Sequence, residues 1–170
     1  NDTLNGRIYG QMATVFAYQD LYDASMEASR EAYRYQEACN HYSGMAYTLR
    51  NMARIHDMLM RKDSAELYYR KAYHLMYDRV SPMKACGIGN EFAGVLLDYK
   101  KVDSAFVWIN KVRWVEESSL TPLILAQVYY ELNQLDSAAY YSQKVLQGNS
   151  IHHTRSAYRI LVKIAEKRKD

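Results

Sequence analysis

Three stretches of the chain share the tripeptide Asp-Ser-Ala: "RKDSAELYYRKAY" at 61–73, "KVDSAFVWINKVR" at 101–113 and "QLDSAAYYSQKVL" at 134–146. An acid beside a hydroxyl has two interpretations, a catalytic pair or a feature that starts a helix. The surrounding residues decide between them, because side chains of matching size recur at the same distances from the acid. Recurrence at many fixed offsets identifies an internal repeat.

Alignment of the chain on this acid gives four copies, separated by 40, 40 and 33 residues. In each copy an alanine lies ten residues before the acid and a small residue lies two residues after it. The acids are Asp23, Asp63, Asp103 and Asp136, the alanines are Ala13, Ala53, Ala93 and Ala126, and the later small residues are Ser25, Ala65, Ala105 and Ala138.

Each copy contains two stretches with the spacing of an amphipathic helix. In the second copy these are about 43–60 and 64–78. Small residues on such a helix let a neighbouring helix approach closely, and large residues fill the space beside them. The sequence therefore predicts antiparallel helix pairs. Ser81-Pro82 and Thr121-Pro122 predict the starts of the first helices in copies three and four, because proline suits the first turn of a helix.

The acid then has a structural explanation. Asp63 lies just before a predicted second helix, where we expect its carboxylate to accept backbone N–H groups of the first turn. Glu66 completes a capping-box pattern, and the negative charge suits the positive end of the helix dipole. Nucleophilic catalysis would also need a base and an oxyanion site, which the pattern lacks. We predict that the protein is not an enzyme and has no catalytic residue.

The order of residue sizes resembles the tetratricopeptide repeat (TPR) family, which repeats about every 34 residues as helix–turn–helix. The stretches "LAQVYYELNQLDSAAYYSQKVL" (125–146) and "DSAELYYRKA" (63–72) carry the resemblance, which covers about 6–150. It implies an all-α, right-handed TPR-like superhelix of about four antiparallel helix pairs plus a C-terminal helix, in a single domain over 1–170. We expect repeats at about 6–40, 43–80, 82–118 and 120–150, and a final helix at about 152–168. The Asp-Ser-Ala wording itself is similar to repeats of bacterial sensor and regulator proteins.

The chain departs from the family pattern in three places. Its 40-residue spacing requires either longer helices, since the excess is nearly two helical turns, or longer loops. The first copy has Ser25 and Ser29 where alanine and an aromatic residue are usual, which suits an end cap. The segment 158–170 reads as another first helix, and it is either a terminal capping helix or the sign of a fragment cut from a longer protein. The absence of Met at residue 1 favours the fragment.

Composition narrows the classes of function. The 170 residues are 49% hydrophobic and 24% charged, enough to form a folded core. With seven glycines and two prolines, an all-β fold with many tight turns is disfavoured. The net charge of +3 is small and evenly spread, so we expect no nucleic-acid partner. The longest uncharged apolar run, 118–130, is shorter than the ~20 residues of a membrane-spanning helix, and we expect no membrane contact by this segment.

The resemblance also indicates a binding face. First helices of a TPR array line its concave surface, where partner peptides lie. Projection of that face onto this sequence gives a groove set, namely Tyr47, Arg50, Arg54, Asp57, Asn90, Glu91, Gln127 and Tyr130. Arg50 and Arg54 lie one turn apart and suit a carboxylate or phosphate. The alternative is a solvated helix face. The Lys/Asn/Arg clamp of chaperone-tail binders is not reproduced, since Gly10 and Thr14 stand where it would begin.

No residue pattern predicts a metal or cofactor. His152-His153 has no further ligands at helical spacing, and we expect His56 to be a packing histidine with satisfied ring nitrogens. Cys39 and Cys86 lack metal-type spacing and are expected to be small buried side chains, with their pairing left open. Most of the 17 tyrosines are expected to pack with the hydroxyl at the surface.

These observations predict a non-catalytic module that docks a protein or peptide segment in its concave groove. The alternative is the ligand-sensing region of a bacterial transcriptional regulator or histidine kinase, which would signal to a further C-terminal output domain. A sensor region would be periplasmic or otherwise extracytoplasmic, and the docking module would be cytoplasmic. The sequence does not constrain the oligomeric state.

Overall fold

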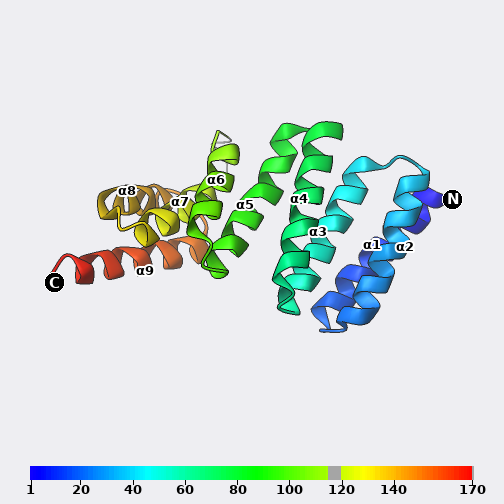
Figure 1. The fold of residues 1–170 in the computed structure, drawn as a ribbon, viewed down its shortest axis with the longest axis horizontal. Coiled ribbons are helices and arrows are strands. Elements are labelled where there is room, and N and C mark those ends of the chain that lie inside the picture. The colour runs from blue at the N-terminus through cyan, green and yellow to red at the C-terminus, as the bar shows by residue number, and fades with distance from the viewer. Residues whose placement is uncertain (115–119, 170) are drawn as a thin grey trace. The chain divides into compact units, whose positions relative to one another are not determined.

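The computed structural model describes residues 1–114 and 120–169 (Figure 1). All regular elements within these residues are α-helices, and the predicted fold class, all-α TPR-like helix pairs followed by a C-terminal helix, is confirmed. The chain divides into two compact units, Asn1–Ile88 and Gly89–Asp170. The helices are α1 (Asp2–Tyr18), α2 (Tyr22–Ala38), α3 (Tyr42–Met58), α4 (Lys62–Arg79), α5 (Pro82–Asp98), α6 (Val102–Val112), α7 (Leu120–Glu131), α8 (Leu135–Leu146) and α9 (Ile151–Lys167).

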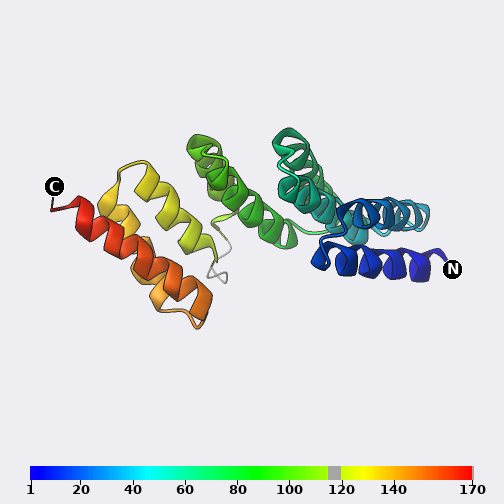
Figure 2. The ribbon, with the colours of Figure 1, turned by 90° about the horizontal axis from the view of Figure 1, so that it is seen from below.

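Within each unit, consecutive helices pack against one another. In the first unit α1 contacts α2, α2 contacts α3 and α3 contacts α4. In the second unit α7 contacts α8, and α9 contacts both of them. Figures 1 and 2 show short turns reversing the chain between these helices. First helices also pack on one another inside each unit: α1 contacts α3 in the first unit, and α7 contacts α9 in the second.

The 40-residue spacing comes from long helices. Helices α1, α2 and α3 each have 17 residues and α4 has 18, whereas α7 and α8 have 12 each. The connections between α1, α2, α3 and α4 are three residues long, as is the one between α7 and α8. Of the two explanations that the sequence left open, the longer helices are therefore the right one for the first unit.

Five of the turns share one backbone conformation, which the sequence pattern did not predict. A residue with positive φ follows the helix, and the next residue donates its N–H to the carbonyl five positions earlier, over 2.8–2.9 Å. This bond closes the end of the helix in the manner of a Schellman motif. Glycine is the usual residue at such a position, but here the residues are Asp20, Asn40, Met60, Lys100 and Asn133, with φ of 55–63°.

The predicted capping role of Asp63 is wrong. Helix α4 begins at Lys62, with Arg61 as its N-cap, and no side-chain cap hydrogen bond is formed. Asp63 lies inside the first turn instead, and Asp23, Asp103 and Asp136 lie at the same place in α2, α6 and α8. The carboxylate therefore acts on the helix through its charge near the positive end of the dipole. Ser150 of α9, by contrast, accepts a hydrogen bond from the backbone of His153.

The four aligned alanines have the same kind of surroundings, as a true repeat requires. Their exposed fractions are at most 2% (Ala13, Ala53, Ala93 and Ala126). In the first pair Ser25 replaces an alanine, and its hydroxyl donates 2.6 Å to the carbonyl of Ala13, so it joins α2 to α1. The outer face of α1 exposes Leu4, Ile8 and Val15 by 43–53%, which differs from the polar outer face expected of an end cap.

The second unit has a core of its own. Phe92 of α5 and Trp108 of α6 meet edge to face with ring centroids 4.9 Å apart. Beyond them α7, α8 and α9 bury a cluster of Leu123, Ala126, Ala138, Val145, Ala157, Ile160 and Ile164. An ion pair between Asp136 and Arg168 joins the start of α8 to the end of α9. Helix α9 is thus packed on two neighbours and belongs to the folded unit.

Three further findings concern the cysteines, helix apolarity and possible metal ligands. Cys39 and Cys86 are both free thiols, and burial raises the pKa of Cys86. No helix within 1–114 and 120–169 has the length and apolarity needed to cross a membrane. The same residues contain no group of three or more His, Cys, Asp or Glu side chains that is arranged to hold a metal ion.

Candidate docking groove on the first helices

A groove of about 620 Å³ lies between the first helices α1 and α3, over one residue of α2. Gly6, Gly10 and Tyr18 line it from α1, and Gly44, Tyr47 and Asn51 line it from α3. Contact between α1 and α3 places these two helices side by side. The groove therefore lies on the helices that the sequence assigned to the binding face.

The floor of the groove is the side-chain amide of Gln36, whose nitrogen and oxygen both have hydrogen-bond partners. Gln36 of α2 is 6% exposed, and its amide nitrogen donates 3.4 Å to the carbonyl of Gly6 in α1. Its amide oxygen accepts from the hydroxyl of Thr48 in α3 at 2.9 Å. Because a buried amide without partners is costly, these two bonds hold α1, α2 and α3 together beneath the groove.

Glycines on both helices make room for the Gln36 side chain that forms this floor. A Cβ atom at Gly6 would lie 3.1 Å from Cγ of Gln36. A Cβ atom at Gly44 would lie 3.0 Å from Cδ of Gln36 and 2.6 Å from Nδ1 of His41. A larger residue at either position would displace Gln36 from the floor of the groove. The sequence interpretation missed this role, because these glycines do not recur in the other copies.

Tyr47 is the member of the predicted groove set that lines this groove. Its side chain is 42% exposed, and the guanidinium of Arg50 lies over its ring, 5.3 Å from the centroid. Arg54 is exposed and Asp57 is half-buried, and both follow on the next turns of α3. The first unit thus places Tyr47, Arg50, Arg54 and Asp57 on one helix, beside the groove rather than all inside it.

The second unit places its predicted residues less uniformly. Asn90 is 1% exposed; its amide donates 2.9 Å to the hydroxyl of Thr121, which in turn donates 3.2 Å to the Asn90 carbonyl oxygen. Asn90 is therefore an interior residue that joins α5 to α7, and we leave it out of the proposed binding face. Glu91 and Gln127 are half-buried.

Tyr130, the last member of the set, lies near two cations. The ammonium groups of Lys163 and Lys167 in α9 lie 5.9 and 5.3 Å from its ring centroid. Both distances are within the range of cation–π attraction. The first helices α7 and α9 of the second unit therefore present an aromatic ring beside two positive charges.

His56 packs as predicted, but its ring is not fully satisfied. The ring stacks on Tyr68 with centroids 5.2 Å apart, while its buried Nδ1 has no hydrogen-bond partner among the described residues. Burial, together with the positive charges of Arg61 and Arg30, lowers the pKa of His56 below its ordinary value of 6.5. The ring of His56 joins α3 to α4 through its contact with Tyr68.

Solved structures of the same fold support the TPR resemblance. BtubC from P. vanneervenii superposes with a TM-score of 0.76, at 18% identity over 97% of this chain and 66% of that chain. MamA (41 to the end) from Desulfovibrio magneticus RS-1 gives 0.68 at 14% identity, covering 97% and 96%. PilF of Pseudomonas aeruginosa gives 0.62 at 16% identity, covering 88% and 64%. All three contain TPRs, and the chain has a TPR-like fold.

Comparison of the sequence with protein families and curated proteins gives no further assignment. No protein-family model matches the chain. No curated protein sequence matches it either. The chain spans slightly less than two thirds of the BtubC and PilF chains, at 66% and 64%. At these identities the likeness concerns the fold alone, so the function has to be inferred from the surfaces of this chain.

Proposed function

We propose that this chain is a non-catalytic protein-binding module that docks a segment of a partner protein on the face formed by its first helices. The observation that carries this proposal is the glycine-lined groove between α1 and α3, with its satisfied polar floor and exposed Tyr47. Helix-pair repeats supply contact area and rigidity, and their surfaces commonly serve binding.

The groove suits a main chain more than a bulky group. Gly10 and Gly44 line the groove without side chains and are only half-buried, so the helix backbones there permit close approach by an extended segment. Tyr47 and Tyr18 stand at its sides with 42% and 81% of their surface exposed. Tyrosine offers a large contact area with few rotatable bonds, so its ordering on binding costs little entropy. These are the properties of a peptide-binding surface.

Polar anchors for the partner follow along α3. Arg50 is held over the Tyr47 ring, and Arg54 lies one turn further. A guanidinium can bind a carboxylate with two parallel hydrogen bonds, and Asp57 on the same helix offers the opposite charge to a basic residue. In the second unit we propose the corresponding anchors Glu91, Gln127 and Tyr130, with Lys163 and Lys167 beside Tyr130.

Affinity capture from an extract of the source cell, quantified by mass spectrometry, tests this function. The variants are Arg50→Ala/Arg54→Ala and Tyr47→Ala, and the matched control is Gln143→Ala/Lys144→Ala on exposed positions of α8. A partner of the groove should be recovered with the control and lost with both α3 variants. Circular dichroism of each variant confirms that the helices are intact. Equal recovery by all variants would contradict the assignment of this face.

A further inference from the structure

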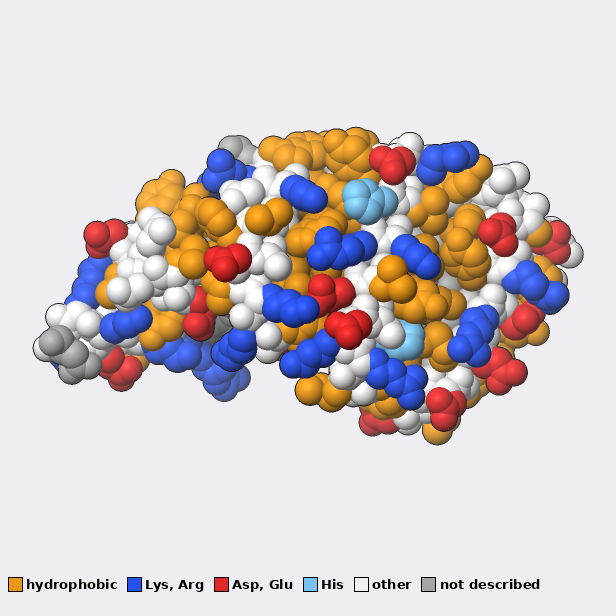
Figure 3. Space-filling model, viewed as in Figure 1, with side chains coloured by type: hydrophobic (Ala, Val, Ile, Leu, Met, Phe, Trp, Pro, Cys, Tyr) orange, Lys and Arg blue, Asp and Glu red, His pale blue; other side chains and the backbone are white. Residues whose placement is uncertain are grey.

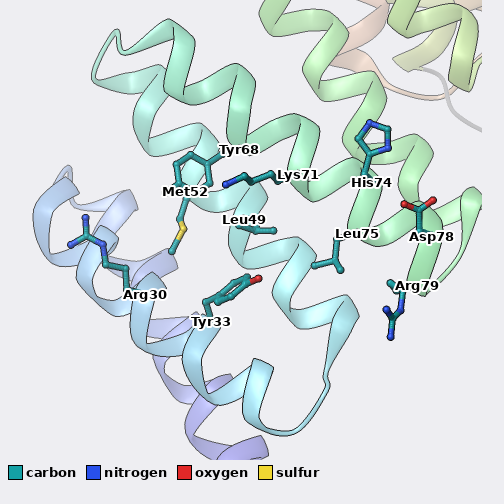
Figure 4. A pocket seen from close by; sticks show the side chains of 10 residues that line it. All are labelled: Arg30, Tyr33, Leu49, Met52, Tyr68, Lys71, His74, Leu75, Asp78 and Arg79. Atoms are coloured by element: carbon teal, nitrogen blue, oxygen red, sulfur yellow. The ribbon is translucent and has the colours of Figure 1, made fainter.

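A second hollow, of about 850 Å³, lies in the first unit between α2 and α4, with α3 beneath it (Figure 4). Its floor consists of Leu49 and Met52 of α3, which are 8% and 5% exposed. Figure 4 shows Tyr33 of α2 and Tyr68 of α4 approaching this floor from opposite sides. None of the residues that line the α1–α3 groove lines this hollow.

The rim of the hollow is positively charged. Arg30 of α2 and Lys71 of α4 are exposed, and Arg79 lies at the far end of α4. The lining contains a single acid, Asp78, which also lies at that far end. In the space-filling view, Lys and Arg side chains border hydrophobic ones over the part of this face formed by α2 and α4, and some acidic side chains lie among them (Figure 3).

Contacts with tyrosine rings hold two of these cations in place. The ammonium of Lys71 lies 5.7 Å from the centroid of the Tyr68 ring, and Figure 4 shows the Lys71 side chain reaching over the floor. The guanidinium of Arg79 lies 4.2 Å from the centroid of Tyr42 and donates 2.6 Å to the Tyr42 hydroxyl. Cations held in this way keep their charge beside the hollow at a lower entropic cost than flexible side chains.

We propose that this hollow is a second docking site, which takes an acidic segment of a partner protein. The segment inserts an aliphatic or aromatic side chain over Leu49 and Met52, between Tyr33 and Tyr68. Its carboxylates lie against Arg30 and Lys71. The site goes beyond the proposed function, because it uses α2 and α4 rather than the first-helix face and does not depend on it.

Charge complementarity selects this occupant. The rim carries three cations and one acid, so a basic segment would be repelled while an acidic one is attracted. An apolar floor of two side chains between two tyrosines matches an inserted side chain at the centre of an interface, with charges at its edge. A second copy of this chain is the competing occupant, and the experiment below tests it.

The probe is a phage-displayed library of random twelve-residue peptides, selected on the full chain and counter-selected on Arg30→Glu/Lys71→Glu. Enriched peptides should combine Asp or Glu with at least one large apolar residue. The strongest of them is then synthesised, and its affinity is measured by fluorescence anisotropy. Arg30→Glu/Lys71→Glu should weaken its binding by about tenfold, and higher salt should weaken binding to the wild type.

A matched control separates this site from the α1–α3 groove. Arg7→Glu/Arg54→Glu changes the net charge by the same amount on exposed positions of α1 and α3 and should leave the affinity within about twofold. The methyl NMR signals of Met52 and Leu49 should shift on titration with the peptide. Replacement of the acids of the peptide by lysine should abolish both effects.

Several results would overturn the proposal. Enrichment of peptides without acids, or of no peptide at all, would refute the charge complementarity. Equal weakening by the two double variants would show that only net charge matters. Self-association of the wild type in sedimentation, lost in Arg30→Glu/Lys71→Glu, would assign the hollow to a second copy. None of these outcomes bears on the first-helix face, whose own variants test it.

Discussion

The turn after α3 offers a prediction in which two opposing effects can be weighed. Met60 has φ of 58°, a left-handed conformation that is unfavourable for any residue with a Cβ atom. It persists because the N–H of Arg61 donates 2.8 Å to the carbonyl of His56, and that of Met60 donates 2.8 Å to Asp57. We predict that Met60→Gly stabilises the first unit.

The magnitude follows from three contributions. Relief of the left-handed conformation gains about 1–2 kcal/mol. The greater freedom of glycine in the unfolded chain offsets about 0.4–1 kcal/mol of this gain. The lost side chain contributes little, because Met60 is 71% exposed. The net expectation is about 0.5–1 kcal/mol, which raises the melting temperature of a unit of this size by about 2–8 °C.

Native-state hydrogen exchange on the full chain is the appropriate assay, because it reads the free energy of opening at α3 and α4 separately from the second unit. Met60→Ala is the first control; it keeps the Cβ atom and should change stability by less than about 0.5 kcal/mol. Arg61→Gly is the second; its φ of −88° needs no glycine, and the substitution should destabilise by about 0.5–1 kcal/mol. If Met60→Gly destabilises as much as Arg61→Gly, residue 60 does not adopt the left-handed conformation in solution and the reasoning fails.

Three further predictions follow from single residues. Gly87→Ala should stabilise the chain by about 0.5–1 kcal/mol in thermal unfolding, because Gly87 lies inside α5 and an added Cβ meets no atom within 4 Å; a loss of stability would show that α5 is not regular there. Asp63→Ala should cost about 0.3–1 kcal/mol in urea unfolding, with the loss shrinking at high salt, because the carboxylate acts on the helix dipole; a salt-independent loss would indicate a cap bond. The lowered pKa of His56 means that this side chain binds a proton more readily in the unfolded chain than in the folded one. The contribution of neutral His56 to the free energy of unfolding is therefore present above pH 6.5 and is lost as the pH falls below it. His56→Gln should remove that part of the pH dependence, and an unchanged stability profile between pH 7 and pH 5 would contradict it.

The repeated features of the chain could be predicted from the sequence because each copy supports the others. Ala13, Ala53, Ala93 and Ala126 were assigned to helix contacts from their register alone, and all four are buried. A single alanine carries no such information, whereas matching residues at fixed offsets require a matching structure. The helix pairs followed from this register. The alternative of longer loops could not be excluded from spacing, because longer helices and longer loops change the spacing equally.

Features that involve backbone geometry could not be predicted in the same way. Met60 and Lys100 adopt positive φ although neither residue type favours it. The backbone hydrogen bonds that close the end of the helix impose the conformation, and the residue type at the position does not reveal them. Asp63 was misassigned for a related reason. A capping pattern in the sequence is shifted by two residues once the helix begins at Lys62.

The hollow between α2 and α4 was not foreseen either, because its residues come from three helices. Leu49 and Met52 lie on the face of α3 that packs on other helices, and both are buried. Nothing in their spacing shows that α2 and α4 leave part of that face uncovered. Arg30 and Lys71 come from different copies and occupy different positions in the repeat, so no alignment of copies would pair them.

Equivalent positions in the copies explain why some residues of the predicted groove set are accessible in the structure while Asn90 is buried. Gly10, Arg50 and Asn90 occupy the same place in α1, α3 and α5, forty residues apart. At Asn90 the side chain bonds to Thr121 of the next first helix along the chain, α7, so this place is directed at a neighbouring helix and not only at a ligand. A projection of one helix shows which residues share a face, but the neighbour that covers part of that face decides which of them remain accessible. Tyr47 is displaced from this place by nearly one turn and keeps 42% of its surface exposed. It is therefore the residue of the set whose substitution tests the first-helix face most directly.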